Sequence, residues 1–509
     1  MFIENTCLPR FTCQSLAVML VLLCGCSSSA TPPLTAKDET GQETSTRLAA
    51  FDEPDDVDRS SRSTAQIESG AGLAGKTLLV DPLVRPISTV KALYGVTFKS
   101  FSGAVKNTVM EGVRLRDLES DPVPPLANAE PMDIGAWEQD LDEMLSRPAS
   151  SGEIDFLVGG KQYFDRLSSA IDSAQYSIDI RTYIFDNDDV ALDVADQLRR
   201  KSQETEVRVM VDGLADLMAT RLDSHSLPEN TQLPASISQY LTYESRVQFR
   251  KQSNPWFTGD HAKMTLIDSD LAFVGGMNIG REYRYDWHDL MMEVKGPVVG
   301  QLQYEFDQAW AKSGLLGDFA WFAGAFDRPP VEVSEDAYPV RILSTSIHNS
   351  EIYRAQLAAI RNARQQIFIQ NTYFSDDAIL VELVAARRRG VDVRVILSEE
   401  GDSNMLDLSN ETAINTMLRN GIRVYRYPGM THVKAAVYDG WACLGSANFD
   451  KLSLQINQEI NLGTSHPETV QRLLDEVFYP DFEKSEELVD SIPTGAKHQV
   501  AEWIVDGFF

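Results

Sequence analysis

The stretch HAKMTLIDSDLAFVGGMN, residues 261–278, decides how the rest of the chain is interpreted. His261 and Lys263 stand two residues apart in an alternating apolar run, so we expect both on one face of a strand. A Gly275-Gly276 pair then leads to Asn278. The segment therefore predicts a strand and a turn that present one imidazole, one ammonium and one amide.

A second copy of the pattern occupies residues 432–448, HVKAAVYDGWACLGSAN. His432 and Lys434 repeat the first pair, Ser446 stands in place of the second glycine, and Asn448 ends the copy. The motif histidines are 432 − 261 = 171 residues apart, and the chain contains only seven histidines. A repeat of this length is the size of a domain, which predicts two similar lobes.

The order of the expected elements also repeats on either side of a proline-containing linker near residues 326–335. In the first half we expect strands at 154–159, 176–185, 206–212, 247–250, 261–267, 271–274 and 290–294, with helices at 163–174, 190–201 and 299–311. In the second half we expect strands at 340–344, 366–374, 392–397 and 423–427, with helices at 351–363 and 378–389. The prediction is an α/β fold of two lobes, 154–330 and 331–509, each a mixed sheet flanked by helices.

Alignment of the two copies reveals a pair of acids. Asp289 and Glu459 each lie eleven residues after the motif asparagine, at the start of an apolar strand. A catalytic histidine needs a second group that fixes its tautomer and stabilises the imidazolium, and a carboxylate does both. A strand-end acid exposed to solvent would be the simpler interpretation of either one alone. Their matched positions favour a role in the site.

The duplicated H-x-K-x4-D pattern with its G-G/S-x-N extension resembles the phospholipase D superfamily over about residues 154–485. Further stretches resemble the bacterial cardiolipin-synthase branch: Asn278-Ile279-Gly280-Arg281-Glu282-Tyr283, Gly296-Pro297, Tyr373-Phe374 and Asn448-Phe449-Asp450. The resemblance implies transfer of a phosphatidyl group through a phosphohistidine intermediate.

The residue types fit that chemistry. Phosphodiester transfer needs a nucleophile, an acid for the leaving alkoxide and positive charge around the phosphate oxygens. We assign His261 as nucleophile and His432 as acid, although the repeat makes them nearly interchangeable. Lys263 and Lys434 supply the charge, and Asn278 and Asn448 supply hydrogen bonds. Neither lobe carries the full set, so the site is expected at the lobe interface.

The remaining motif residues complete the predicted site. Asp268 and Asp439 belong to the catalytic set, but their odd spacing from the histidines suggests that they brace the site or end the strand. Gly276, Ser446 and Tyr373 are predicted to contact the substrate. No group of His, Cys, Asp and Glu has metal-ligand spacing, so we expect neither a metal nor another cofactor.

The N-terminus predicts export and lipidation. Leu16–Leu23 is too short to span a bilayer but suits a signal peptide over residues 1–25. Leu23-Cys24-Gly25-Cys26 resembles the bacterial lipobox, which implies an acylated Cys26, and an ordinary cleaved signal is the alternative. Residues 26–75 are rich in Ser, Thr, Pro and acids, and we expect a disordered tether. The protein would face the periplasm, and Ser27 slightly favours the outer membrane.

An N-terminal extension, residues 76–153, is predicted before the first lobe. Apolar residues at three- and four-residue steps over 83–116 predict an amphipathic helix, with six basic residues and one acid. It either lies on an anionic bilayer or packs on the protein body with its basic face against acidic surface. We slightly favour packing, because three glycines weaken an isolated helix. An acidic connector follows, with one short helix at 137–145.

Four functions are to be weighed against the sequence. The leading hypothesis is a phosphatidyltransferase that uses phospholipid substrates, and a hydrolase that releases phosphatidic acid is the alternative. The formal net charge of −29 disfavours a nuclease and any general nucleic-acid partner. A non-catalytic lipid-binding module would be expected to lack a His or Lys in one copy, and neither is missing. The oligomeric state is left open.

Overall fold

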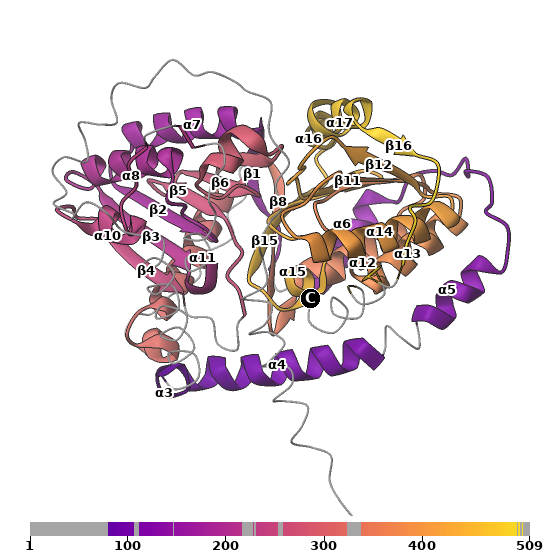
Figure 1. Ribbon diagram of the computed structural model, residues 1–509, viewed down its shortest axis with the longest axis horizontal. Coiled ribbons are helices and arrows are strands. Elements are labelled where there is room, and N and C mark those ends of the chain that lie inside the picture. The colour runs from indigo at the N-terminus through magenta and orange to yellow at the C-terminus, as the bar shows by residue number, and fades with distance from the viewer. Residues whose placement is uncertain are drawn as a thin grey trace, which may run out of the picture.

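The computed structural model describes residues 80–105, 111–145, 147–215, 227–228, 231–252, 258–322, 337–495, 497–498 and 501. The predicted signal peptide, Cys26, the tether and the linker near 326–335 lie outside these residues. Two α/β lobes stand side by side, the first formed by the N-terminal half of the chain and the second by the C-terminal half (Figure 1). No helix in the described ranges combines the length and apolar character required to cross a bilayer.

The sheets of the two lobes have the same strand order. In the first lobe the order is β1 (Ser150–Val158), β7 (Leu290–Lys295), β6 (Leu271–Gly275), β5 (Met264–Ile267), β2 (Ser177–Thr182), β3 (Glu206–Asp212) and β4 (Gln248–Gln252). In the second it is β8 (Tyr338–Ser346), β15 (Glu459–Thr464), β14 (Trp441–Gly445), β13 (Ala435–Tyr438), β10 (Gln366–Gln370), β11 (Asp392–Ser398) and β12 (Arg423–Tyr427). Each sheet is mixed, since β2, β3 and β4 pair in parallel, as do β10, β11 and β12, while the other pairs are antiparallel. The predicted fold class is confirmed.

One continuous sheet joins the lobes. Strand β8 pairs with β15 along its length and with β1 at Ser150↔Val340 to Gly152↔Tyr338, so 16 strands form a single sheet. The second lobe adds β16 (Glu486–Leu488) at its far edge and β9 (Asn349–Ser350) beside β8. This shared sheet fixes the orientation of one lobe relative to the other, which a site between them requires.

Helices cover the sheets where the apolar periodicity places them. The first lobe carries α7 (Gly160–Ser173), α8 (Asp189–Lys201), α10 (Ile237–Thr242) and α11 (Val298–Ser313). The second carries α12 (Glu351–Asn362), α13 (Asp377–Arg388), α14 (Asn404–Arg419), α15 (Lys451–Gln455), α16 (Pro467–Leu473) and α17 (Tyr479–Lys484). Asp188 and Asp376 cap the equivalent helices α8 and α13 by accepting amide hydrogen bonds, of 2.8 and 3.0 Å. The repeat thus extends to the helix caps.

The N-terminal extension forms α3 (Asp81–Val84), α4 (Pro86–Val105), α5 (Gly112–Glu119) and α6 (Ile134–Met144). Helix α4 runs along one side of the molecule below both lobes (Figure 1). The predicted helix over 83–116 is therefore present as two helices, and α6 lies close to the predicted 137–145. Helix α4 is continuous across Gly95. There it packs against Ile347, and a Cβ on Gly95 would lie 2.3 Å from the Ile347 side chain.

The predicted strand at 261–267 is shorter than expected. Strand β5 begins at Met264, so His261 and Lys263 precede it, and the second copy is the same, with β13 beginning at Ala435. The physical reason lies in the opposite lobe: the His261 N–H donates to the Gln458 carbonyl at 2.8 Å, and the His432 N–H to the His288 carbonyl at 2.6 Å. Both histidines leave their own sheet to bond with the other lobe.

Candidate active site

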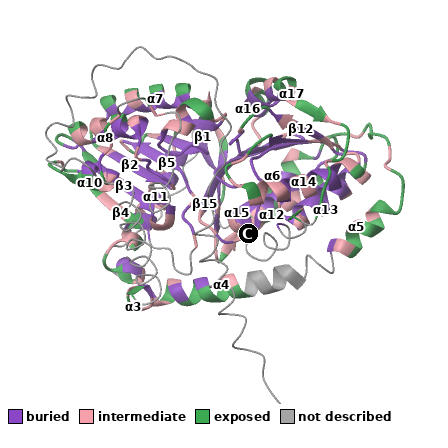
Figure 2. Cartoon of the chain, in the orientation of Figure 1, coloured by how far each residue is buried: buried purple, intermediate pink, exposed green. Residues whose placement is uncertain are grey.

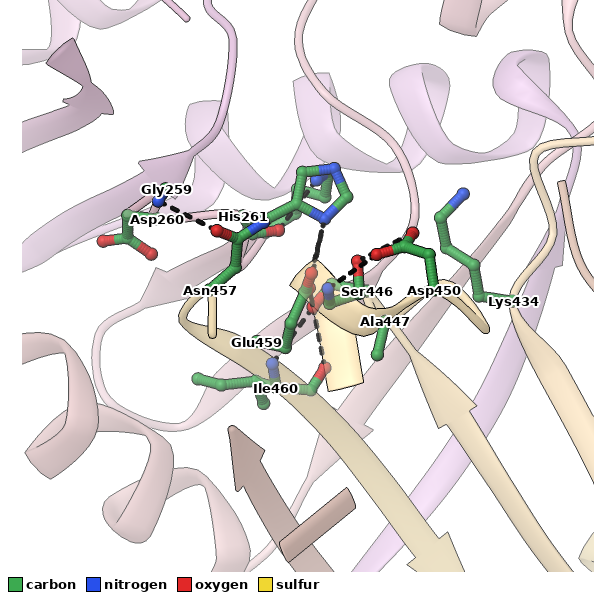
Figure 3. Close-up of polar contacts among 12 residues, drawn as sticks. Gly259, Asp260, His261, Lys434, Ser446, Ala447, Asp450, Asn457, Glu459 and Ile460 are labelled. Carbon is green, nitrogen blue, oxygen red and sulfur yellow. Dashed lines mark hydrogen bonds and ion pairs between the residues drawn. The ribbon is translucent and has the colours of Figure 1, made fainter. Parts of the chain in front are cut away.

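The two motif histidines meet the two aligned acids, but across the lobes. His261 Nδ1 lies 2.9 Å from Glu459 Oε1, and His432 Nδ1 lies 2.6 Å from Asp289 Oδ2. Each histidine is therefore oriented by the carboxylate of the opposite repeat, as Figure 3 shows for His261 above Glu459. With Nδ1 held by a carboxylate, the Nε2 atom of each ring is left available for chemistry.

Backbone contacts set up this crossing. Isolated bridges pair Asp260 with Gln458 and His288 with Thr431, the residues that flank the histidine–acid pairs. The segments before each histidine and before each acid thus run side by side at the lobe interface. Because the two bridges are equivalent in the two repeats, the arrangement has an approximate two-fold relation.

In each lobe, the residue two positions before the motif asparagine contacts the acid that follows it in the sequence. A Cβ on Gly276 would lie 2.3 Å from Asp289 Oδ1, so the carboxylate occupies the space that a side chain would fill. In the second lobe Ser446 Oγ donates to Glu459 Oε2 at 2.5 Å, beside the carboxylate in Figure 3. Both residues therefore contact the acids. A contact of either residue with the substrate stays a prediction.

Substituting Gly276 with alanine is expected to lower kcat by about 10- to 100-fold. The added methyl must displace the Asp289 carboxylate, which leaves His432 without its orienting partner even though the two residues belong to different lobes. Steady-state kinetics of Gly276→Ala would check this. Gly300→Ala is the matched control, because a Cβ there meets nothing within 4 Å, and it should keep full activity. Equal rates for both variants would contradict the prediction.

The two lysines are buried and lack a carboxylate partner among the described residues. Lys263 and Lys434 are 1% and 3% exposed, and each Nζ donates to the carbonyl of its own motif histidine at 2.7 Å. Lys434 Nζ also donates to Thr372 Oγ1 at 3.3 Å. A buried ammonium group without a counter-ion is costly, so this pair favours an anionic ligand between them.

Burial also sets the protonation of the site. Desolvation lowers the pKa of Lys263 to about 7, against the opposing charge of Glu459, and that of Lys434 to about 8, against Asp289. Desolvation, with Lys434 nearby, lowers the pKa of His432 to about 4, and desolvation lowers the pKa of His261 as well. The lowered pKa of His261 keeps its ring neutral, as a nucleophile must be. His432 must take up a proton before it can act as an acid, and a bound phosphate anion favours its protonated form.

We expect kcat/KM to fall on the alkaline side between pH about 7 and about 8, where Lys263 and Lys434 lose their charge. An anionic substrate stabilises the ammonium forms and raises both pKa values, so the fall in kcat should lie at higher pH than the fall in kcat/KM. A Lys263→Arg enzyme keeps its charge and should show an alkaline limb shifted upward. An unshifted limb in this variant would argue that another group titrates.

The motif asparagines are placed differently in the two lobes. Asn278 Oδ1 accepts from Thr182 Oγ1 and from the Ile184 amide, both at 3.2 Å, and its Nδ2 donates to Tyr283 Oη at 2.7 Å. Asn448 is 8% exposed, and its Oδ1 has no partner. Of the two asparagines, Asn448 is the one whose amide oxygen has no hydrogen-bond partner among the described residues.

Asp268 and Asp439 lie at turns, away from the histidine–acid pairs. Both have positive φ, 55° and 49°, directly after β5 and β13. Asp268 accepts hydrogen bonds from the amides of residues 175–177 at 2.6 to 3.2 Å, and Asp439 accepts from the amides of Met132, Arg364, Gln365 and Gln366 at 2.7 to 3.0 Å. Each carboxylate ties the start of a strand to a neighbouring turn.

Aromatic rings enclose the histidines, and the motif-based prediction omitted them. Tyr183 packs edge-on against His261 with ring centroids 4.8 Å apart, and its ring lies 5.2 Å from Lys263 Nζ. Tyr283 and Trp287 contact His432 at 5.7 and 5.2 Å. The segment predicted as a strand at 176–185 matches the one predicted at 366–374, and this match could have found Tyr183. In the structure β2 ends at Thr182, so Tyr183 follows the strand directly.

The predicted substrate residue Tyr373 is hydrogen-bonded to Asp402. Its hydroxyl contacts the Asp402 carboxylate and accepts from the Asp402 amide at 2.9 Å. Asp402 acts electrostatically on Lys434, Tyr183 and Tyr283, so this loop after β11 faces the same centre. The motif-based prediction omitted Asp402, because this residue lies in the loop after β11 and outside the two histidine motifs.

One group of carboxylates in the described part of the chain has the geometry to hold a metal ion. Carboxylate oxygens of Asp186, Asp188 and Glu282 lie within 4.8 Å of one another. Burial raises the pKa of all three, and that of Asp188 to about 7. The Asp188 oxygens already accept the amides of Ala191 and Arg281 at 2.8 and 2.6 Å. The expectation that the chemistry uses no metal stays a prediction.

Comparison with known proteins agrees with the repeat. The family described as "Cardiolipin synthase, PLD-like domain" matches residues 167–310 and 357–478, together more than half of the chain. Cardiolipin synthase A of Pseudomonas putida (strain GB-1) is 29% identical over 367 residues, which cover 67% of this chain and 70% of that protein. Cardiolipin synthase 1 of Bacillus anthracis is 28% identical over 65% of this chain and 67% of its own length.

A solved structure shows the same fold. The phosphatidylserine synthase of Haemophilus influenzae Rd KW20 superposes with a TM-score of 0.57 and 13% identity, covering 74% of this chain and 99% of that one. Both family segments include a motif histidine, and the strand order repeats across them. The chain belongs to the cardiolipin synthase family with phospholipase D-like domains.

Proposed function

We propose that this phosphatidyltransferase of the phospholipase D type moves a phosphatidyl group from one phospholipid to the hydroxyl of a second lipid. The observation that carries the proposal is the pair of histidine–acid contacts that cross the lobe interface, with two buried lysines beside them. Two histidines allow one to attack phosphorus while the other protonates the leaving alkoxide. Their separate acids keep both rings oriented throughout the cycle.

The proposed cycle has two steps. His261 Nε2 attacks phosphorus, the bond to the first alcohol breaks, and His432 delivers a proton to that alkoxide, which leaves as the free alcohol. His432, now neutral, accepts the proton of the incoming hydroxyl, whose oxygen displaces His261 and restores the free enzyme. Glu459 stabilises the charge on His261, and Asp289 stabilises that on His432.

The two lysines would stabilise the negative charge on the phosphate oxygens. Lys263 and Lys434 lie two residues after the two histidines and would bind the non-bridging phosphate oxygens, whose negative charge persists in the transition state. Asn448 offers a further polar group, with its amide oxygen unpaired. The proposal needs no metal, because two ammonium groups supply the positive charge.

The second candidate is hydrolysis, with water in place of the second lipid. The site is the same for both reactions, and the acceptor alone distinguishes them. The test supplies the purified full chain with phosphatidylglycerol or phosphatidylethanolamine and identifies the products by mass spectrometry. Cardiolipin supports transfer, phosphatidic acid alone supports hydrolysis, and no product with any phosphodiester lipid would overturn both.

Membrane attachment through an acylated Cys26 on the periplasmic face, with the outer membrane slightly favoured, belongs to the same proposal. A tether of about fifty residues spans roughly 40 Å as a flexible coil, which keeps a catalytic domain close to a lipid surface. Cell fractionation of Cys26→Ala tests it. Release of the variant from membranes would support acylation at this residue.

A further inference from the structure

Helix α4 presents its apolar side outward, the reverse of an ordinary surface helix. The residues that face the body are polar or small: Arg85, Thr89, Ala92 and Gly95 are buried. Most of the exposed residues on α3 and the described part of α4 are large and apolar, and Lys91 and Thr97 are the exceptions. Leu83 is 80% exposed, Val90 and Tyr94 66%, Ile87 49% and Leu93 38%. Figure 2 shows exposed and buried residues alternating along the described part of this helix.

Specific contacts hold the helix in this orientation. Arg85 forms an ion pair with Asp81 at 3.0 Å and donates to the carbonyls of Lys312, Ser313 and Gly314 at 3.1 to 3.3 Å. The Ser88 amide donates to Asp318 Oδ2 at 2.7 Å. The close approach of Gly95 to Ile347 adds a contact with the second lobe. A rotation that buried the apolar residues would break all of these contacts.

A second segment adds apolar side chains beside the first. Between α11 and the 3₁₀ helix η6 (Gly317–Phe322), Leu315 is 98% exposed and Leu316 52%, while Phe319 within η6 is 42% exposed. Gly317 lies against Val84, where a Cβ would meet the Val84 carbonyl at 2.6 Å. We call this region the outer patch: Val80, Leu83, Ile87, Val90, Leu93, Tyr94, Leu315, Leu316 and Phe319. Apolar surface contributed by two distant segments is typical of an interaction site.

Charge favours a lipid surface as the occupant. Residues 83–116 contain six basic residues and one acid in a chain of net charge −29. Among their described basic side chains, Lys91 is exposed within the patch, whereas Arg85 is buried against the body and Arg114 pairs with Glu382. A two-fold contact between copies would place this basic segment against itself, which is unfavourable. An anionic bilayer offers both an apolar interior for the large side chains and negative headgroups for Lys91.

The position of the outer patch in the chain also favours a lipid surface as its occupant. The segment that begins with the predicted acylated Cys26 is 79 − 26 + 1 = 54 residues long and precedes Val80, which lies inside the patch. A lipid anchor and an interfacial helix are the two signals that stable membrane binding requires. We propose that α3, α4 and η6 form a docking face that lies on an anionic phospholipid surface. This docking is independent of the chemistry at the histidines.

The test measures binding of the full chain carrying Cys26→Ala to vesicles, so that no acyl chain contributes. Vesicles of phosphatidylcholine with phosphatidylglycerol are compared with phosphatidylcholine alone by co-sedimentation. The triple variant Leu83→Asp, Val90→Asp, Leu315→Asp should bind the anionic vesicles at least about tenfold more weakly, because three apolar contacts are lost. Lys91→Glu should weaken binding to the anionic vesicles only, and more at low salt.

Matched controls separate the patch from general surface changes and from catalysis. Tyr176→Asp and Val489→Asp replace residues that are 74% and 82% exposed elsewhere, and they should bind like the parent. His261→Ala should also bind normally, and the triple variant should keep its activity on lipid dispersed in detergent. Unchanged vesicle binding of the triple variant would overturn the proposal. A parent that dimerises without vesicles, with a monomeric triple variant, would also overturn it in favour of contact between copies.

Discussion

Replacing His261 with alanine is expected to reduce kcat by a factor of about 10⁴ or more. In the proposed cycle His261 forms the bond to phosphorus, and no other described residue is both paired to Glu459 and poised to replace it. Loss of the ring should leave the fold intact, because its Nδ1 contact is with a carboxylate at a site that is partly open. Product formation from phospholipid, followed by mass spectrometry, measures the loss.

The second histidine separates the two roles. His432→Ala removes the proposed acid, so a substrate with a good leaving group should restore the first step, release of the first alcohol, in this variant but not in His261→Ala. A radiolabelled phosphatidyl group should remain on the protein in His432→Ala under acid-free quenching. His466→Ala is a matched control, since His466 stacks on Tyr338 and bonds to Thr469 far from the motif histidines in the chain. Recovery in the His261 variant instead would reverse the assignment.

The sequence predicted the fold and the members of the site because both repeat. The strands and helices recur in the same order in both halves, with histidine, lysine and asparagine at matching positions. Such a repeat restricts the possible topologies to two similar lobes. Asp289 and Glu459 were identifiable for the same reason, from their equal distance to the motif asparagines. Which acid serves which histidine was not predictable, because the crossing depends on a sheet that continues between lobes.

The apolar periodicity predicted the wrong start of a strand where the chain forms hydrogen bonds with the other lobe. An alternating pattern predicted that the strand starts at His261, yet the His261 amide bonds to Gln458 of the second lobe and the ladder begins only at Met264. Helix α4 is a similar case. Its stripe was recognisable as amphipathic, but the pattern alone cannot say that Arg85 and Thr89 face the body while Val90 and Tyr94 face outward.

The histidine–acid contacts between the lobes explain why both repeats are needed for the site. A single lobe holds a histidine and an acid that belong to two different reacting centres, so neither lobe can orient its own imidazole. Only the two lobes together, joined by the β8–β1 pairing, complete both histidine–acid units. Loss of one carboxylate should therefore impair the histidine of the opposite lobe, and this consequence can be measured.

Glu459→Gln is expected to lower kcat by about 10²- to 10⁴-fold, with a much smaller change in KM. The amide keeps the size of the side chain but removes the charge that stabilises the imidazolium of His261, and it can present a donor to Nδ1 that selects the wrong tautomer. Because Glu459 opposes the desolvation that lowers the pKa of His261, the variant should lower that pKa further. The acidic limb of kcat/KM should move to lower pH.

Asp289→Asn is the matched variant in the other lobe, and the two together test the crossing. Asp289 contacts His432 at 2.6 Å, so its loss should impair protonation of the leaving group and be relieved by a substrate with a good leaving group. Glu459→Gln should gain nothing from such a substrate, because its defect lies at the nucleophile. If instead Asp289→Asn reproduced the defect of His261→Ala and Glu459→Gln that of His432→Ala, each acid would serve the histidine of its own lobe during catalysis. The pairing at 2.9 and 2.6 Å across the interface predicts the opposite pattern.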